Sequence, residues 1–229
     1  MQEDHAPNHA PHYPLIYMFR FLLVSFNIEA ILQESTIYRR RERLSKITGG
    51  LGLGDAYGAT IERIKAQGGD KSRLGIAALM WISHAERPLS MNELCYALAV
   101  ELGSRDFDTN NIPSISTLVG CCQGLITVDK EASTVRLIHF TLQEYLSSLP
   151  NIFSGPHSTM AEICLTYLNS KQVKSIRADP FRDIPDIPFL KYSSVYWGVH
   201  AKRELSECAR SLALEIFGNT ITTYRENCF

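Results

Sequence analysis

The sequence has almost no net charge, no paired cysteine motif and no long apolar run, and each absence excludes a class of protein. Twenty-three Lys and Arg oppose 24 Asp and Glu, so the net charge of -1 gives the whole chain no attraction to phosphate backbones or anionic membranes. The six cysteines form no CxxC pair, which argues against a disulfide framework and favours a reducing compartment. Partners must therefore be sought in local patches.

The first residues show no targeting signal. The opening MQEDHAPNHAPHYP lacks the basic start of a signal peptide, and the apolar run behind it is broken by Arg20, Asn27 and Glu29. Residues 1–14 are rich in Pro, His and Asn and are predicted to be a disordered leader. We therefore expect a globular, cytoplasmic protein that makes no membrane contact.

Motifs for catalysis and metal binding are missing as well. The sequence contains no GxxxxGK[ST] phosphate loop, no GxSxG elbow, no HExxH and no Cys/His cluster at zinc spacing. The glycine-rich GGLGLGDAYG misses the dinucleotide-binding spacing and is interpreted as a turn between helices. His5, His9 and His12 would suit a metal only in a helix, which their Pro-rich surroundings disfavour. We predict no catalytic residue, no metal site, no cofactor and no small-molecule substrate.

What is present is a series of helical patterns interrupted by one β-hairpin. A first helix is predicted at about 36–47, a second in DAYGATIERIKAQ and a third over 71–86. A further helix follows a capping box of Ser90 and Glu93, and the next lies in PSISTLVGCCQ. GLITVDKEASTVRLIHF then reads as two strands around a polar turn. Three helices followed by a hairpin is the element order of a winged helix. The predicted fold class is therefore mainly α, a winged helix flanked by helical segments.

The C-terminal part is predicted to be helical. Thr141 and Glu144 fit a second capping box, and helices follow at about 157–169 and 189–217, the latter breaking near Leu205. Between them SIRADPFRDIPDIP carries three prolines and is predicted to be a loop.

These patterns predict five parts of the chain. After the leader, a helical linker is expected at 15–70 and the winged helix at 71–149. A helical extension at 150–218 and a tail at 219–229 complete the chain.

Many winged helices bind DNA, and the sequence offers one basic run for that purpose. Arg39, Arg40, Arg41 and Arg43 could contact nucleic acid, although a solvated helix face is the commoner meaning of such a run. The expected recognition helix is unsuited to the task, because the segment 111–128 contains no Lys or Arg. A nucleic-acid-binding winged helix that uses the arginine run remains the alternative hypothesis.

Three stretches carry a family resemblance. LMWISHAERPLSMNELCYALAVELGS, STLVGCCQGLITVDKEASTVRLIHFTLQEYL and AEICLTYLN resemble the winged-helix region of fungal NACHT-type signal-transducing NTPases, which often carry ankyrin repeats. The same module is named for a GPI inositol-deacylase-like winged helix. The resemblance implies a module that holds a neighbouring NACHT domain in a closed, ADP-bound state.

The resemblance also implies a role for one histidine. In animal relatives the segment His-x-[TS]-Phe-Gln-Glu-[YF]-[LF] places its histidine on the β-phosphate of ADP, and HFTLQEYL matches it with Leu142 in place of Phe. His139 is therefore the implied nucleotide-sensing residue, to be used only with a NACHT domain. Its alternative role is a hydrogen bond to a backbone carbonyl at a tight corner.

The departures from the family pattern limit what the chain is expected to do. It contains neither a Walker A lysine motif nor a TPLHxA-like ankyrin unit. We therefore expect a non-enzymatic regulatory module, a fragment or truncated paralogue, whose partners are proteins such as a NACHT/ankyrin relative in cis or in trans. A lipid-modifying enzyme is disfavoured because no GxSxG serine is present.

Overall fold

The structure is a computed structural model that describes residues 28, 31–48, 53–104, 106–149, 151–178 and 187–226. The predicted leader at 1–14, with His5, His9 and His12, lies outside the described residues. The chain divides into two compact units, residues 1–62 and residues 63–229, and each is described by itself.

In the first unit the basic run lies on helix α2, Ile37–Thr48, close to the predicted range. The Thr36 hydroxyl oxygen accepts the backbone N–H of Arg39 at 3.3 Å and so satisfies a free donor at the helix start. Helix α3, Leu53–Ala66, begins in this unit with Asp55 in its first turn, where an acidic side chain suits the helix dipole.

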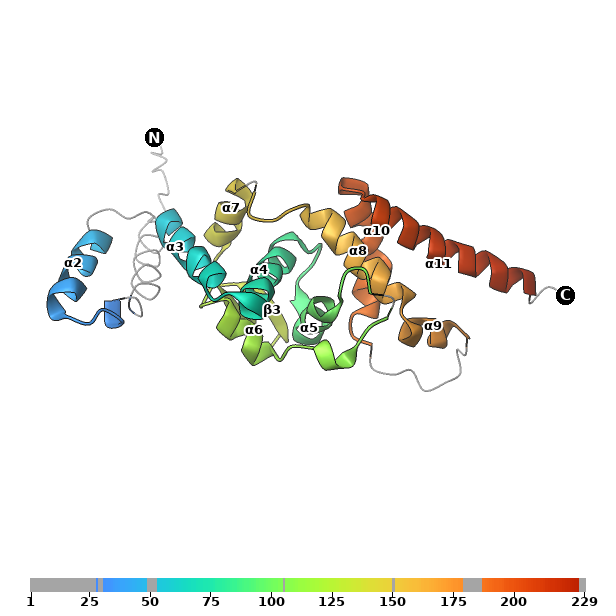
Figure 1. Ribbon diagram of the computed structural model, residues 1–229, viewed down its shortest axis with the longest axis horizontal. Helices are drawn as coiled ribbons and strands as arrows, with labels where there is room; N and C mark the ends of the chain where they lie inside the picture. Colours follow the sequence, from blue (N-terminus) through green and yellow to red (C-terminus); the bar gives the residue numbers. More distant parts are fainter. Residues whose placement is uncertain are drawn as a thin grey trace, which may run out of the picture. The chain divides into compact units, whose positions relative to one another are not determined.

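The second unit contains the winged helix, which confirms the predicted fold class. Among the described residues of this domain, three α-helices precede the hairpin. The elements of the winged helix in chain order are α4 Gly69–His84, β1 Leu89–Ser90, α5 Met91–Ala99, the 3-10 turn η1 Thr109–Asn111, α6 Ile115–Cys121, β2 Ile126–Asp129 and β3 Thr134–Leu137. The strands form one antiparallel sheet in the order β1-β3-β2, so β3, the strand labelled in Figure 1, is the central one. Strand β1 was not predicted, because two residues are too short to show an alternating pattern.

The predicted hairpin is confirmed. In its register Val128 faces Val135 and Ile126 faces Leu137. Ile126 and Val135 are buried beneath the sheet, while the turn is closed by the Asp129 carboxylate, which accepts the N–H of Ala132 at 3.0 Å. A polar turn between apolar strands thus gives the wing its shape.

The capping box at the start of α5 is also confirmed. The Ser90 hydroxyl accepts the N–H of Glu93 at 3.1 Å, and the Glu93 carboxylate accepts the N–H of Ser90 at 2.8 Å. Both bonds satisfy donors that the helix itself leaves unpaired. The short strand β1 therefore passes directly into α5 without a loop.

A glycine allows α4 and α6 to pack closely. A Cβ atom on Gly75 would lie 2.8 Å from the backbone oxygen of Cys121 and 2.8 Å from the Ile64 side chain. Any larger residue must therefore push the two helices apart. Cys122 supports the same contact, since its thiol donates to the Gly75 carbonyl oxygen at 3.7 Å.

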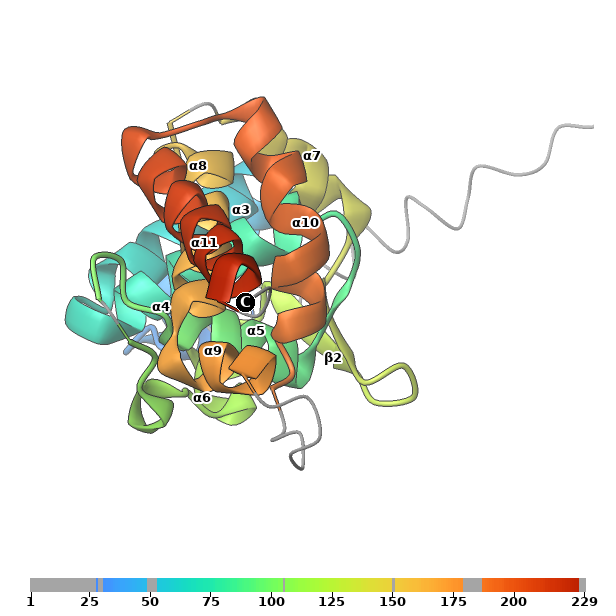
Figure 2. The ribbon, with the colours of Figure 1, turned by 90° about the vertical axis from the view of Figure 1, so that its right-hand side faces the viewer.

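In the described part of the chain after the sheet the helices are α7 Phe140–Ser148, α8 Pro156–Asn169, α9 Lys171–Ala178, α10 Leu190–Arg203 and α11 Glu207–Glu226. Figure 2 shows α8 beside α10 and α11. The predicted break near Leu205 is confirmed. The prediction that SIRADPFRDIPDIP is a loop is wrong for its first residues, because α9 extends to Ala178. Pro180 disfavours helix only at the residue directly before it, so a helix can end two residues earlier.

Aromatic side chains join the winged helix to these C-terminal helices. Trp81 of α4 is fully buried and meets Phe189 and Tyr192 edge-on, with ring centroids 5.5 and 5.8 Å apart. A second core lies between α8 and α11, where Ala161 and Leu165 pack on Ala209. Trp81 and Tyr192 are therefore core residues. Among the described helices, none has the length and apolar composition needed to cross a membrane.

Candidate functional site

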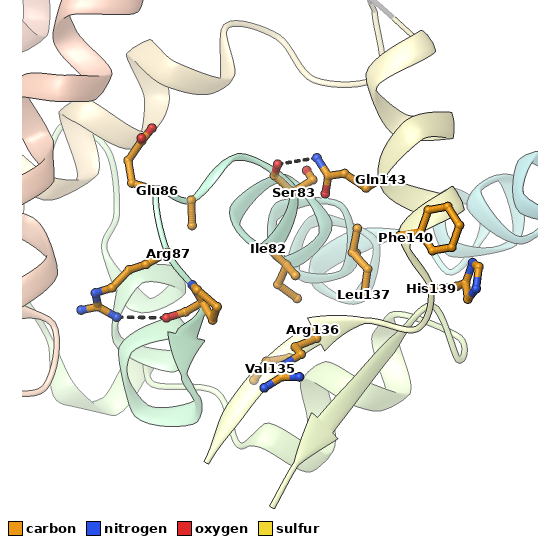
Figure 3. Close-up of a pocket in the computed structure, with 12 residues that line it drawn as sticks. Ile82, Ser83, Glu86, Arg87, Val135, Arg136, Leu137, His139, Phe140 and Gln143 are labelled. Carbon is orange, nitrogen blue, oxygen red and sulfur yellow. Dashed lines mark hydrogen bonds between the residues drawn. The ribbon is translucent and has the colours of Figure 1, made fainter. Parts of the chain in front are cut away.

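The pocket that contains His139 lies where the end of α4, strand β3 and the start of α7 meet (Figure 3). Its volume is about 420 Å³. Ile82, Val135 and Leu137 provide its apolar lining, whereas Arg87 and His139 lie at opposite ends. The implied nucleotide-sensing residue therefore borders a cavity large enough for part of a ligand or for a partner's side chains.

His139 is the N-cap residue of α7. Its backbone is extended, with φ -155° and ψ 151°, and its Nδ1 atom accepts the backbone N–H of Thr141 at 3.3 Å. The Thr141 hydroxyl lies 2.8 Å from the same nitrogen. Because Nδ1 acts as an acceptor, the neutral ring carries its proton on Nε2. The cap therefore fixes both the orientation and the tautomer of the imidazole.

This geometry corrects the prediction of a second capping box from Thr141 and Glu144. Helix α7 begins at Phe140, two residues earlier than that box requires, so Thr141 is already inside the first turn. The sequence pattern misled because histidine is an uncommon cap, whereas Thr followed by Glu three residues later is a common one. The alternative role expected for His139, a hydrogen bond to a backbone carbonyl at a corner, has the wrong partner, because the ring accepts a backbone N–H at this corner.

A second residue of the family segment anchors α7 to the rest of the domain. The Gln143 side-chain amide donates to the backbone oxygen of Ser83, near the end of α4, at 2.7 Å (Figure 3). Leu142 and Leu146 are buried on the same helix. The start of α7 is thus held by apolar packing and by a hydrogen bond to α4, which fixes His139 relative to the pocket.

Ser83, which lines the pocket, and the adjacent His84 form the pair that most resembles a nucleophile and its base. The Ser83 hydroxyl lies 2.8 Å from His84 Nδ1, but it also lies 2.6 Å from the Leu79 carbonyl oxygen. Because a carbonyl only accepts, the serine proton points to Leu79 and the histidine nitrogen donates. Burial lowers the pKa of His84. The pair is therefore a helix-end contact and cannot activate the serine.

The two arginines of the pocket are already paired. Arg87 donates two hydrogen bonds to the Glu93 carboxylate, at 2.9 and 2.5 Å, and its guanidinium stacks over the Tyr192 ring with 5.3 Å to the centroid. Arg136 forms an ion pair with Asp129 at 2.9 Å. Paired arginines contribute little net attraction for an anion, so the pocket alone is not a phosphate-binding cradle.

The predicted basic contact patch lies on α2, and two of its arginines make contacts within the protein. Arg40 donates to the carbonyl oxygens of Glu34 and Leu32 at 2.9 and 3.1 Å, and Arg43 pairs with the Glu34 carboxylate at 2.5 Å. Arg39 and Arg41 are exposed. Two of the four arginines thus close the turn before α2 and are less available to a nucleic acid.

Helix α6 occupies the place of the recognition helix in a winged helix. Its sequence ISTLVGC carries no cation, and Ser114 caps it by accepting the N–H of Thr117 at 3.1 Å. The structure therefore leaves unchanged the argument against base reading by this helix.

Sequence reasoning missed a cluster next to the pocket. Glu86, His157 and His200 come from three separate elements yet place their polar atoms together. No local spacing signals this cluster, because 71 residues of chain separate Glu86 from His157 and 43 separate the two histidines.

Residues 61–154 match the family model described as GPI inositol-deacylase, winged helix domain. The match includes every element of the winged helix and extends through α7 to the following turn. Comparisons with curated proteins and with solved structures give no significant match. Geometry and sequence agree for this segment: residues 61–154 contain a winged helix similar to that of GPI inositol-deacylase.

Proposed function

We propose that the chain is a non-enzymatic regulatory module that binds a nucleotide-binding domain of the NACHT type and stabilises its ADP-bound state. The neighbouring domain is in the same polypeptide or in a separate one. The observation that carries the proposal is the cap formed by His139, whose Nδ1 bonds to Thr141 and whose proton is thereby placed on Nε2.

An imidazole N–H is a suitable donor to a phosphate oxygen. The start of α7 adds the positive end of a helix dipole, which favours a negatively charged group. Phe140, the next residue, is 56% exposed and offers an apolar contact beside the donor. Donor, dipole and apolar contact together suit the edge of a nucleotide-binding surface.

The phosphate-binding groups themselves must come from the partner. Arg87 and Arg136 are paired with carboxylates, and Ser83 is bonded to a backbone oxygen. These residues offer neither a phosphate cradle nor an activated nucleophile. The pocket therefore supports recognition and regulation rather than catalysis.

The first experiment measures ATP turnover by the purified chain. We expect a rate equal to that of a heat-denatured control, with or without Mg²⁺. Turnover that exceeds the control and copurifies with the chain would contradict the non-enzymatic assignment.

A further inference from the structure

A cluster of two histidines and one glutamate joins the winged helix to the C-terminal helices. Glu86 lies in the loop between α4 and β1, His157 in the first turn of α8, and His200 in the last turn of α10. The Nδ1 atoms of the two histidines are 2.9 Å apart. One ligand atom from each of the three residues lies within 4.8 Å of the others.

The surroundings hold these side chains in place. His200 is fully buried, and its Nε2 atom lies 2.9 Å from the Tyr192 hydroxyl. The same hydroxyl oxygen accepts the backbone N–H of Glu86 at 3.2 Å. A hydrogen bond on the second nitrogen of a histidine is the usual way in which proteins orient a metal ligand.

Both imidazoles lie in surroundings that favour the neutral ring. Burial, together with the neighbouring His157, lowers the pKa of His200 to about 4, and burial and Arg203 lower the pKa of His157. A neutral imidazole keeps a nitrogen lone pair that can bind a metal ion. With a cation between the two Nδ1 atoms, each ring would carry its proton on Nε2, and His200 would donate that proton to Tyr192.

We propose that Glu86, His157 and His200 bind a divalent transition-metal ion, with Zn²⁺ as the best match. Two imidazoles and one carboxylate with a water as fourth ligand form a common tetrahedral zinc set, whereas Mg²⁺ and Ca²⁺ prefer oxygen ligands. Zinc–nitrogen bonds of about 2.0–2.1 Å separate two tetrahedral nitrogens by roughly 3.3 Å. The rings therefore need to part by only a few tenths of an ångström.

Arg203 competes with the metal. Its guanidinium donates to both carboxylate oxygens of Glu86, at 2.5 and 3.1 Å, and lies 3.5 Å from His157 Nε2. A metal on Nδ1 would leave a proton on this Nε2, which then repels the guanidinium. The Arg203 side chain is 48% exposed and has room to move into solvent. The cation would thus replace the arginine on Glu86.

The site would tie three elements together. The loop after α4 belongs to the winged helix, whereas α8 and α10 belong to the C-terminal helices. A metal bound to all three would restrain the winged helix against these helices. This inference is independent of the proposed contact with a nucleotide-binding domain.

The test titrates Zn²⁺ into the full chain in which His5, His9 and His12 are changed to Gln, so that histidines near the N-terminus cannot bind the metal. We expect one equivalent to bind, and the melting temperature to rise by roughly 5–10 °C at a free concentration a hundred times the dissociation constant. Co²⁺ should give the intense visible absorption of a tetrahedral site.

Two variants that each remove a proposed ligand, and two that each remove a neighbouring positive charge, sharpen the test. His157→Gln and Glu86→Gln should weaken binding by more than roughly tenfold; both side chains are partly exposed, so folding is checked without metal by circular dichroism. Arg203→Gln should tighten binding, whereas Lys202→Gln, which removes an exposed neighbouring charge, should not. Two results would overturn the proposal. One is that neither the parent, with His5, His9 and His12 changed to Gln, nor its Arg203→Gln variant binds Zn²⁺ saturably. The other is that both ligand variants bind Zn²⁺ as tightly as the parent.

Discussion

Thr141 donates its backbone N–H to the Nδ1 atom of His139 at 3.3 Å, and its hydroxyl lies 2.8 Å from the same nitrogen. A residue that resembles a nucleotide sensor is therefore also the cap of the helix that follows it. The structural and the functional interpretations of His139 use different nitrogens of one ring. Substitutions can separate them, because a capping side chain need not be an imidazole.

Replacing the cap should affect stability according to the capping ability of the new residue. His139→Ala removes the acceptor and should lower the free energy of unfolding by about 0.5–2 kcal/mol. His139→Asn supplies an amide oxygen to the same N–H and should retain most of the stability. Urea unfolding followed by circular dichroism measures both. Equal losses in the two variants would show that capping is not what His139 contributes.

The contact between α4 and α6 should not tolerate a side chain at Gly75. A methyl group there meets backbone and side-chain atoms at 2.8 Å, so Gly75→Ala should destabilise the protein by about 1–3 kcal/mol. The matched control is Gly120→Ala on α6, where a Cβ meets nothing within 4 Å. The control should be neutral, or stabilising by up to about 1 kcal/mol, because alanine favours helix. Similar melting temperatures for the two variants would contradict this packing.

Glu93 should make stability depend on pH in the acid range. Burial alone would raise the pKa of Glu93, but hydrogen bonds from Arg87 and Ser90 bring this pKa below its ordinary value of 4.5. The unfolded chain then takes up the proton first as pH falls. The stabilisation is complete above pH 4.5 and is lost as pH drops through the lower, folded-state pKa.

The variant Glu93→Gln should remove this part of the acid dependence. At pH 7 it should also cost about 1–3 kcal/mol, because Arg87 loses its charged partner. Glu144→Gln, which removes an exposed carboxylate from α7, is the control and should keep the acid dependence. Unfolding free energies measured between pH 3 and pH 7 compare them. A curve for Glu93→Gln parallel to that of the parent chain would argue against the pair.

The chain should not bind duplex DNA. Helix α6 carries no cation, and Arg40 and Arg43 are held by backbone oxygens and by Glu34. We expect no mobility shift of a short duplex even at about 50 mM salt, where phosphate contacts are strongest. A shift that weakens with added salt and vanishes on changing Arg39 and Arg41 to Ala would instead support the nucleic-acid-binding alternative.

The winged helix could be predicted from the sequence because its signals are local. The capping box of Ser90 and Glu93 and the two strands around Asp129 each lie within a few residues. Strand β1 could not be predicted, because two residues are too few to show an alternating pattern. Its pairing partners, Thr134 and Val135, come more than 40 residues later in the chain. Local pattern thus predicts elements but not the short strand that completes their sheet.

The candidate site could be predicted only in part. The family segment pointed to His139, but the pattern of Thr141 and Glu144 favoured the wrong cap, since a histidine cap has no sequence rule. The cluster of Glu86, His157 and His200 was invisible for a different reason. Its members meet only when α8 and α10 pack together beside the winged helix, which no local pattern specifies.

The most direct test of the regulatory account is the rate of ADP release from a NACHT-type nucleotide-binding domain of the same source organism, mixed with the purified chain. We predict that the chain slows release and that His139→Asn, which keeps the cap, abolishes the effect. Release unchanged by the chain, or slowed equally by His139→Asn, would contradict the account.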